Sequence, residues 1–168
     1  MLLRPAGALL ALSLAAVAAP QIRTWPNDDA GFAAFAAEIE QAHPRNLLAR
    51  KGVQARGASA ELADGEAGAR GGAGRVGIDG QPSVLTYYLG EVKPIHRVGF
   101  YTFNIDARAN QDYEVRFADN GANPGKEPAF PEAPDCTVGD RVIGPDAGGC
   151  HSWFERPDGQ PLARADWV

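Results

Sequence analysis

In 99-GFYTFNIDARANQDYEVRF-117, apolar side chains alternate with polar ones on both sides of a short polar loop, and our prediction of the fold starts from this pattern. We expect a β-hairpin whose loop is residues 107–111. A one-residue slip in strand pairing would set apolar side chains opposite charged ones, so the register is well specified. Each pair that faces the core in this register is apolar: Ile105 with Tyr113, Phe103 with Val115, and Tyr101 with Phe117.

The outward face of this hairpin is polar apart from one aromatic residue. Such a face is typical of a solvated sheet surface. The alternative is a binding face for a glycan or a protein, on which the aromatic ring stacks against the ligand and the polar groups hydrogen-bond to it. The candidate ligand-binding residues are Phe100, Thr102, Asn104 and Arg116.

Motifs for catalysis or metal binding are scarce. Glycoside hydrolysis needs two carboxyl groups about 5 to 9.5 Å apart, and the candidates are Asp106 and Glu114 on the outward face. The G-x-S-x-G motif is absent, and the three histidines are scattered without H-E-x-x-H. The loop at residues 119–123 has oxygen ligands that suit calcium but lacks EF-hand spacing, so we expect a plain Asn-Gly turn. We therefore assign no catalytic residue, no metal and no cofactor.

Residues 83–168 form the predicted β domain. Runs of β-branched and aromatic residues indicate short strands, and Pro/Gly turns separate them. The pattern predicts a mainly β fold, either a small β-sandwich or a partly open barrel, over about residues 80–168. The expected strands cover residues 84–89, 95–105, 113–117, 141–143 and 152–155, with another near the C-terminus.

The chain has two cysteines, Cys136 and Cys150. An oxidising compartment favours pairing them. The bridge would close a loop of about 15 residues and contribute about 3 kcal/mol in the loop-entropy model. A metal site needs more ligands and a redox pair is normally spaced C-x-x-C, so we expect a structural disulfide.

The N-terminal residues indicate export. Arg4 precedes an apolar run over residues 8–17, and Ala16-Val17-Ala18 matches the small-x-small pattern of a cleavage site. The run is shorter than the roughly 20 residues that span a membrane. We predict a signal peptide at residues 1–18 and a secreted, extracellular product. Without Arg4 the 21 acidic residues outnumber the basic ones by about six, which argues against nucleic acid or an anionic membrane surface as the partner.

A helix is predicted in the segment that follows, residues 19–51. Apolar side chains recur at helical spacing over residues 28–43, with Asn27 as the expected N-cap. The paired basic residues Arg50 and Lys51 come next. The segment is therefore either a propeptide that is cut after this pair or an ordinary tethered helix.

The composition changes over residues 52–82. This range is rich in glycine and alanine and has few aliphatic side chains. Such a segment buries too little apolar area to offset its chain entropy, so a flexible linker is predicted.

Three stretches carry a resemblance to a group of known proteins. At VGFYTFNIDARANQDYEVRFADNGANPG, CTVGDRVIGPDAGGCHSWF and the closing ADWV, the sequence resembles small secreted proteins of filamentous fungi that have a one-disulfide β domain. The resemblance covers roughly residues 80–168 and implies an extracellular protein that faces a host or a cell wall. It transfers no site residues.

The function that these observations favour is extracellular binding. We expect a secreted, non-enzymatic β domain that interacts with a glycan, a cell wall or a host protein. The alternative is a small secreted hydrolase that acts on glycans.

Overall fold

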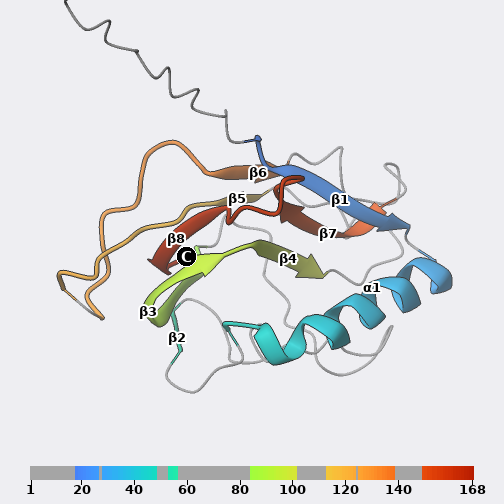
Figure 1. Ribbon diagram of the computed structural model, residues 1–168, viewed down its shortest axis with the longest axis horizontal. Helices are drawn as coiled ribbons and strands as arrows, with labels where there is room; N and C mark the ends of the chain where they lie inside the picture. Colours follow the sequence, from blue (N-terminus) through green and yellow to red (C-terminus); the bar gives the residue numbers. More distant parts are fainter. Residues whose placement is uncertain are drawn as a thin grey trace, which may run out of the picture.

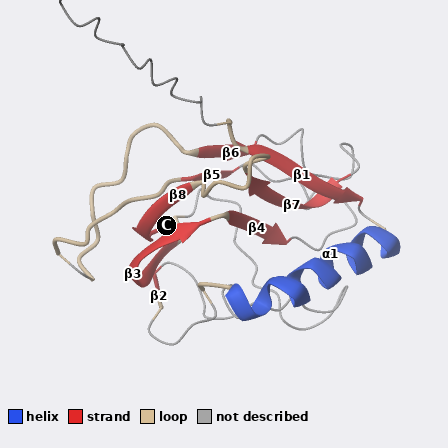
Figure 2. Cartoon of the chain, viewed as in Figure 1, coloured by secondary structure: helices blue, strands red, loops and turns tan. Residues whose placement is uncertain are grey.

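The computed structural model describes seven stretches of the chain. Within them the chain is mainly β, with eight strands in three small sheets, one α-helix and one 3-10 turn (Figures 1 and 2). The described sheets form no closed barrel. The mainly β class predicted from the sequence is confirmed. The described residues are 18–26, 28–48, 53–56, 84–101, 113–123, 125–138 and 149–168.

The first sheet is antiparallel and has the order β1-β7-β4. β7 (Gly149–Glu155) lies between β1 (Gln21–Pro26) and β4 (Arg97–Tyr101), as Figure 1 shows. Trp153 is the centre of this sheet, because Arg23 pairs with it from one side and Gly99 from the other.

Two smaller sheets complete the strands. In the second sheet β3 (Thr86–Ile95) lies between β2 (Gln54–Arg56) and β8 (Ala163–Trp167). The third sheet pairs β5 (Tyr113–Val115) with β6 (Cys136–Val138). A single bridge from Ala118 to Trp167 ties the chain after β5 to β8.

The predicted helix is confirmed as α1 (Asp29–Ala42), which a short 3-10 turn, η1 (His43–Arg45), continues. Its N-cap is Asp28, whose carboxylate accepts a hydrogen bond from the Gly31 N–H at 2.7 Å. The predicted cap, Asn27, lies outside the described residues. Gly31 is required where it stands, because a Cβ there would collide with the carbonyl of Pro26.

Both faces of β7 are covered. On one side, Trp153 packs with Trp25 and Phe35 under α1. On the other side, Phe154 packs into a second cluster that draws on all three sheets. Buried members of that second cluster are Ile95, Val115, Phe117, Cys136, Val138, Phe154, Leu162 and Ala165.

The predicted hairpin is wrong in its pairing. Tyr101 is the Cα partner of His151 on β7, not of Phe117. The Phe117 N–H donates to the Asp135 carboxylate at 2.8 Å, because the chain has already left β5 there. The expected pairs with Phe103 and Ile105 lie outside the described residues.

The predicted strand over residues 95–105 is divided between two sheets. Ile95 ends β3, and its carbonyl accepts a hydrogen bond from the Leu162 N–H at 2.7 Å. β4 begins at Arg97 and joins β7 instead. The chain therefore changes sheets at His96. The expected strand at residues 141–143 lies outside the described residues.

The N-terminal segment is built into the β fold. The sequence suggested that residues 19–51 precede the β domain, but β1 pairs with β7 from Gln21↔Glu155 to Pro26↔Gly149. A cut after Lys51 would consequently leave β1 held by its sheet. Arg50 and Lys51 themselves lie outside the described residues.

The predicted linker, residues 52–82, is only partly described. Residues 54–56 form β2 and pair with β3, which corrects that part of the prediction. Residues 57–83 lie outside the described part of the chain. No described helix has the length and apolar character needed to cross a membrane.

Candidate functional site

The side of the first sheet that faces α1 carries an aromatic cluster. Trp25 comes from β1, Phe35 from α1 and Trp153 from β7. Their ring centroids lie 5.0 to 6.2 Å apart, and every pair meets edge to face. This is the favoured geometry for aromatic pairs, so the three rings fix the helix on the sheet.

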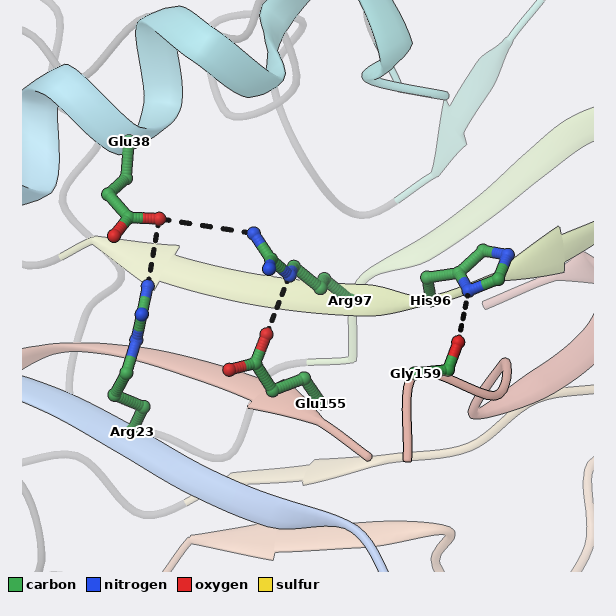
Figure 3. Close-up of polar contacts among 6 residues, drawn as sticks. All are labelled: Arg23, Glu38, His96, Arg97, Glu155 and Gly159. Carbon is green, nitrogen blue, oxygen red and sulfur yellow. Dashed lines mark hydrogen bonds and ion pairs between the residues drawn. The ribbon is translucent and has the colours of Figure 1, made fainter. Parts of the chain in front are cut away.

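Four charged side chains surround this cluster, and we call them the charged rim: Arg23, Glu38, Arg97 and Glu155. Figure 3 shows Glu38 reaching down from α1 toward arginines on β1 and β4. Its Oε2 lies 2.8 Å from Arg23 Nη2 and 3.9 Å from Arg97 Nη1. Arg97 Nε also meets Glu155 Oε2 at 2.6 Å. Two arginines on opposite sides of β7 thus converge on one carboxylate oxygen.

Both guanidinium groups also stack on indole rings. Arg23 lies 4.3 Å from the Trp25 centroid, and Arg97 lies 4.8 Å from the Trp153 centroid. Cation–π contact adds about 0.5 to 2 kcal/mol and restricts where the planar group can turn. The arginine side chains nevertheless remain 42% and 46% exposed. The charged rim is therefore ordered and accessible to solvent at the same time.

Gly99 makes room for the central indole. A Cβ at this position would lie 2.6 Å from Trp153 Nε1 and 2.7 Å from its Cδ1. Such distances are far below van der Waals contact, so only glycine lets Trp153 lie across β4. The opening residue of the stretch 99–117 thus has a packing role.

The ligand-binding residues predicted from the hairpin are not brought together by the described part of the fold. Phe100 is half-buried, packs against the second core cluster and stacks on Tyr113 with centroids 4.0 Å apart. It was expected on the opposite face from Tyr113, so its assignment as an exposed platform is wrong. Thr102, Asn104 and Asp106 lie outside the described residues.

Arg116 and Glu114 contact each other, and they do not form a common binding face with Phe100. Arg116 Nη2 donates to Glu114 Oε2 at 2.5 Å and to the carbonyl of Glu132 at 3.2 Å. Glu114 is exposed at the surface of β5. Its carboxylate is engaged by an arginine, and its proposed catalytic companion, Asp106, is outside the described residues.

A pair of hydrogen-bonded hydroxyl groups lies on the face of β7 that points away from α1. The hydroxyls of Tyr113 and Ser152 are 2.7 Å apart and share a hydrogen bond. Burial raises the pKa of Tyr113 above its usual value of 10.0, although its hydrogen bond to Ser152 opposes the shift. A phenol with a raised pKa stays neutral at physiological pH, so this pair is suited to structure rather than to base catalysis.

Cys136 is a buried free thiol in the structure. Burial, assisted by the nearby Asp135, raises the pKa of Cys136 from 9.0 to about 11. A thiol with this pKa is a poor nucleophile at neutral pH. Cys150 lies on β7, but its side chain is outside the described part, so the disulfide stays a prediction.

No cluster of three or more His, Cys, Asp or Glu side chains that could hold a metal ion occurs in the described residues. The loop considered for calcium contains a turn, in which the Gly121 N–H donates to Asp119 Oδ1 at 2.9 Å. Asn120 caps the same loop through its side-chain donation to the Lys126 carbonyl at 2.7 Å. His96 is exposed and its Nδ1 lies 3.2 Å from the Gly159 carbonyl (Figure 3).

Sequence inspection missed all four residues of the charged rim. Arg23 and Glu38 lie in the segment that was set apart from the β domain, and Arg97 fell inside an overlong strand. One signal was present: Arg23 and Trp25 are two positions apart, as are Trp153 and Glu155, so each pair shares a strand face.

Comparisons with protein-family models, with curated proteins and with solved structures gave no match for this chain. The resemblance to small secreted fungal proteins therefore stays a prediction.

Proposed function

We propose that the protein is a secreted, non-catalytic binding domain that recognises an acidic extracellular glycan through the charged rim. The observation that carries this proposal is the convergence of Arg23 and Arg97 on one carboxylate oxygen while both side chains stay nearly half exposed. A planar guanidinium offers several donors in a geometry that matches a carboxylate. A uronate sugar presents the same carboxylate chemistry as Glu38.

Preorganisation supports binding at this rim. The stacking of each guanidinium on an indole and the ion pair between Arg97 and Glu155 hold the donors in place before any ligand arrives. A ligand then loses less free energy to side-chain ordering. Glu38 acts as an internal competitor, because a ligand carboxylate would take its place or share its donors.

The hydrolase alternative has no specific observation in its favour. Glu114 contacts Arg116, and its proposed partner, Asp106, lies outside the described residues. Secretion through a signal peptide at residues 1–18 and the disulfide between Cys136 and Cys150 are parts of the same proposal. So is a two-layer sandwich, which the burial of Phe154 among residues of β5 and β6 supports.

The test is a binding titration of the secreted protein against uronate-rich and neutral polysaccharides. We expect binding to the uronate polymer, and a loss of about tenfold to a hundredfold in Arg97→Ala, because one charge-assisted hydrogen bond contributes about 1.5 to 3 kcal/mol. Arg164→Ala is the matched control, since Arg164 is an exposed arginine on β8. That variant should bind as the wild type does.

The variant Glu38→Gln distinguishes a rim that binds a ligand from a rim that only holds α1 on the first sheet. If the rim binds a carboxylate, removing the internal competitor should raise affinity while lowering stability slightly. If the rim only holds the helix on the sheet, Glu38→Gln and Arg97→Ala should both lower the free energy of unfolding, and neither should change polysaccharide binding. Equal binding of neutral polysaccharides, or preference for an acidic peptide, would contradict the glycan assignment.

A further inference from the structure

The connection between β7 and β8, residues 156–162, is organised by two charged side chains. Arg156 donates from Nε to the Pro161 carbonyl at 3.1 Å and from Nη2 to the Leu162 carbonyl at 3.4 Å. Asp158 Oδ1 accepts the Gln160 N–H at 3.0 Å. Each side chain closes part of the loop and still has polar atoms left for other contacts.

Those atoms hold the backbone of residue 18. Asp158 Oδ2 accepts the Ala18 N–H at 3.3 Å, and Arg156 Nη1 donates to the Ala18 carbonyl. The contact lies at the end of the sheet where β1 begins beside β7, since Gln21 pairs with Glu155 there (Figure 1). A carboxylate and a guanidinium therefore hold one residue of the chain just before the first strand.

This place in the sequence coincides with the predicted cleavage site after Ala18. Cleavage would remove Ala18 together with the carbonyl that Arg156 holds, and would create a new α-ammonium group at Ala19, one peptide unit from the N–H that Asp158 accepts in the unprocessed chain. An α-ammonium carries a full positive charge and three donors, so it is a better partner for a carboxylate than a peptide N–H. At this exposed position the contact is not closed off from solvent.

We propose that Asp158 is the binding site for the N-terminal α-ammonium of the processed chain, with Arg156 as the residue that positions the loop around it. The inference rests on the proposed secretion, because only processing creates this ammonium group. It gives the 156–162 loop a role beyond connecting two strands. The loop fastens the start of β1 after the leader has been removed.

The experiment begins with mass spectrometry of the intact secreted protein, which identifies the first residue. The pKa of its α-ammonium is then measured by NMR titration in the wild type and in Asp158→Asn. We expect Ala19 as the first residue and a pKa of its α-ammonium above the ordinary range of about 7.7 to 8.0. In Asp158→Asn the value should return to about that range, because the ion pair is gone.

Asp119→Asn is the matched control. Asp119 closes a turn two residues on, through the Gly121 N–H, as Asp158 does through the Gln160 N–H, but it lies on a different loop. It should leave the α-ammonium pKa unchanged, so a shift in that variant would point to a non-specific charge effect and overturn the inference.

The outcomes separate the two proposals. A first residue of Ala19 whose α-ammonium has an ordinary pKa that Asp158→Asn does not change would overturn the binding site and leave secretion standing. A chain that keeps residues 1–17 would overturn both. A chain that starts beyond Ala19 would be secreted but would lack the ligand for Asp158, which also overturns the inference.

Discussion

On the helix side of β7, Trp153 lies among aromatic rings with charged groups at their edge, whereas on the opposite side Phe154 lies in a largely aliphatic cluster and Ser152 bonds to Tyr113. The first side is built with β1 and α1, from the N-terminal part of the chain. The second is built with β3, β5, β6 and β8, from the C-terminal half. The single strand β7 thus separates a charged, partly solvent-exposed face, which we call the wet side, from a buried structural face, which we call the dry side.

The largest expected effect is on the helix side. Trp153→Ala removes the ring that contacts Trp25, Phe35 and Arg97, and leaves a cavity under α1. We expect a loss of about 3 to 5 kcal/mol in the free energy of unfolding, measured by denaturant titration with far-UV circular dichroism. The control, Val84→Ala at a side chain that is 80% exposed, should stay within about 0.5 kcal/mol. A loss below about 1 kcal/mol for Trp153→Ala would show that the helix side contributes little to stability.

Gly99→Ala tests the close approach on the same side. The new methyl group would meet the Trp153 ring, so we expect a loss of about 1 to 3 kcal/mol in thermal or denaturant unfolding. In a Trp153→Phe background the smaller ring leaves room, and the cost of Gly99→Ala should shrink. Additive costs in the double variant would mean that the contact with Trp153 is not the cause.

Ser152→Ala tests the dry side. Ser152 is fully buried, and the substitution deprives the Tyr113 hydroxyl of its partner. We expect a loss of about 1 to 3 kcal/mol. The double variant Ser152→Ala with Tyr113→Phe should cost less than the two single changes added together, because it removes both partners at once. A double-mutant cycle without coupling would contradict this account of the pair.

Stability at high pH depends on the dry side, because Cys136 and Tyr113, the two groups with the largest increases in pKa, lie there. Folding raises the pKa of Cys136 from 9.0 to about 11, so above pH 9 the unfolded thiol loses its proton first and unfolding is favoured. Stability should therefore fall from pH 9 to about 11, and Tyr113 should add to the loss above pH 10.

Reductant makes this prediction a test of the disulfide. If Cys136 pairs with Cys150 in the secreted protein, the part of the loss that starts at pH 9 should appear only after reduction. Cys136→Ala should abolish that part in either condition. The measurement is the unfolding midpoint from pH 7 to 11. If Cys136→Ala shows the same decline as the reduced wild type, the loss of stability above pH 9 does not come from the Cys136 thiol.

The smallest effect is expected at the charged rim. Glu38→Gln removes the carboxylate that meets Arg23 and Arg97, but these side chains are partly exposed, so the loss in stability should be below about 1 kcal/mol. It should shrink further in high salt, where exposed charges are screened. Glu40→Gln, at an exposed position on the same helix, is the control. A larger loss of stability that does not change with salt concentration would show that the charged rim has a mainly structural role.

Much of the local structure could be predicted from the sequence. The helical spacing of Phe32, Phe35 and Ile39 gave α1 to within a residue at each end, and the burial of Val115 and Phe117 followed from alternation. These predictions depend on neighbours along the chain, which a sequence pattern records directly. The strand partners could not be predicted in this way.

The pairing and the candidate site depend on residues far apart in the sequence. The residues of β4, within GFYTF, contain no local pattern that favours pairing with β7 over pairing with the next strand in the sequence. In β7 the consecutive residues Ser152, Trp153 and Phe154 are all buried, so this strand shows no alternation of polar and apolar residues that would reveal its position between two others. The rim was missed for the same reason. Arg23, Glu38 and Arg97 meet only after β1 and β4 have found β7.

The position of β7 between β1 and β4 has a consequence for how the chain folds during synthesis. β1 emerges first and has to wait for a partner that is made more than a hundred residues later, so the first sheet cannot close until the chain is nearly complete. Non-local pairing of this kind slows folding, because a long loop must be closed before the contacts repay its entropy. In the interval Trp25 and Phe35 are left without Trp153. Until β7 is made, their apolar surface is open to non-native contacts, which are the usual cause of aggregation in slowly folding chains.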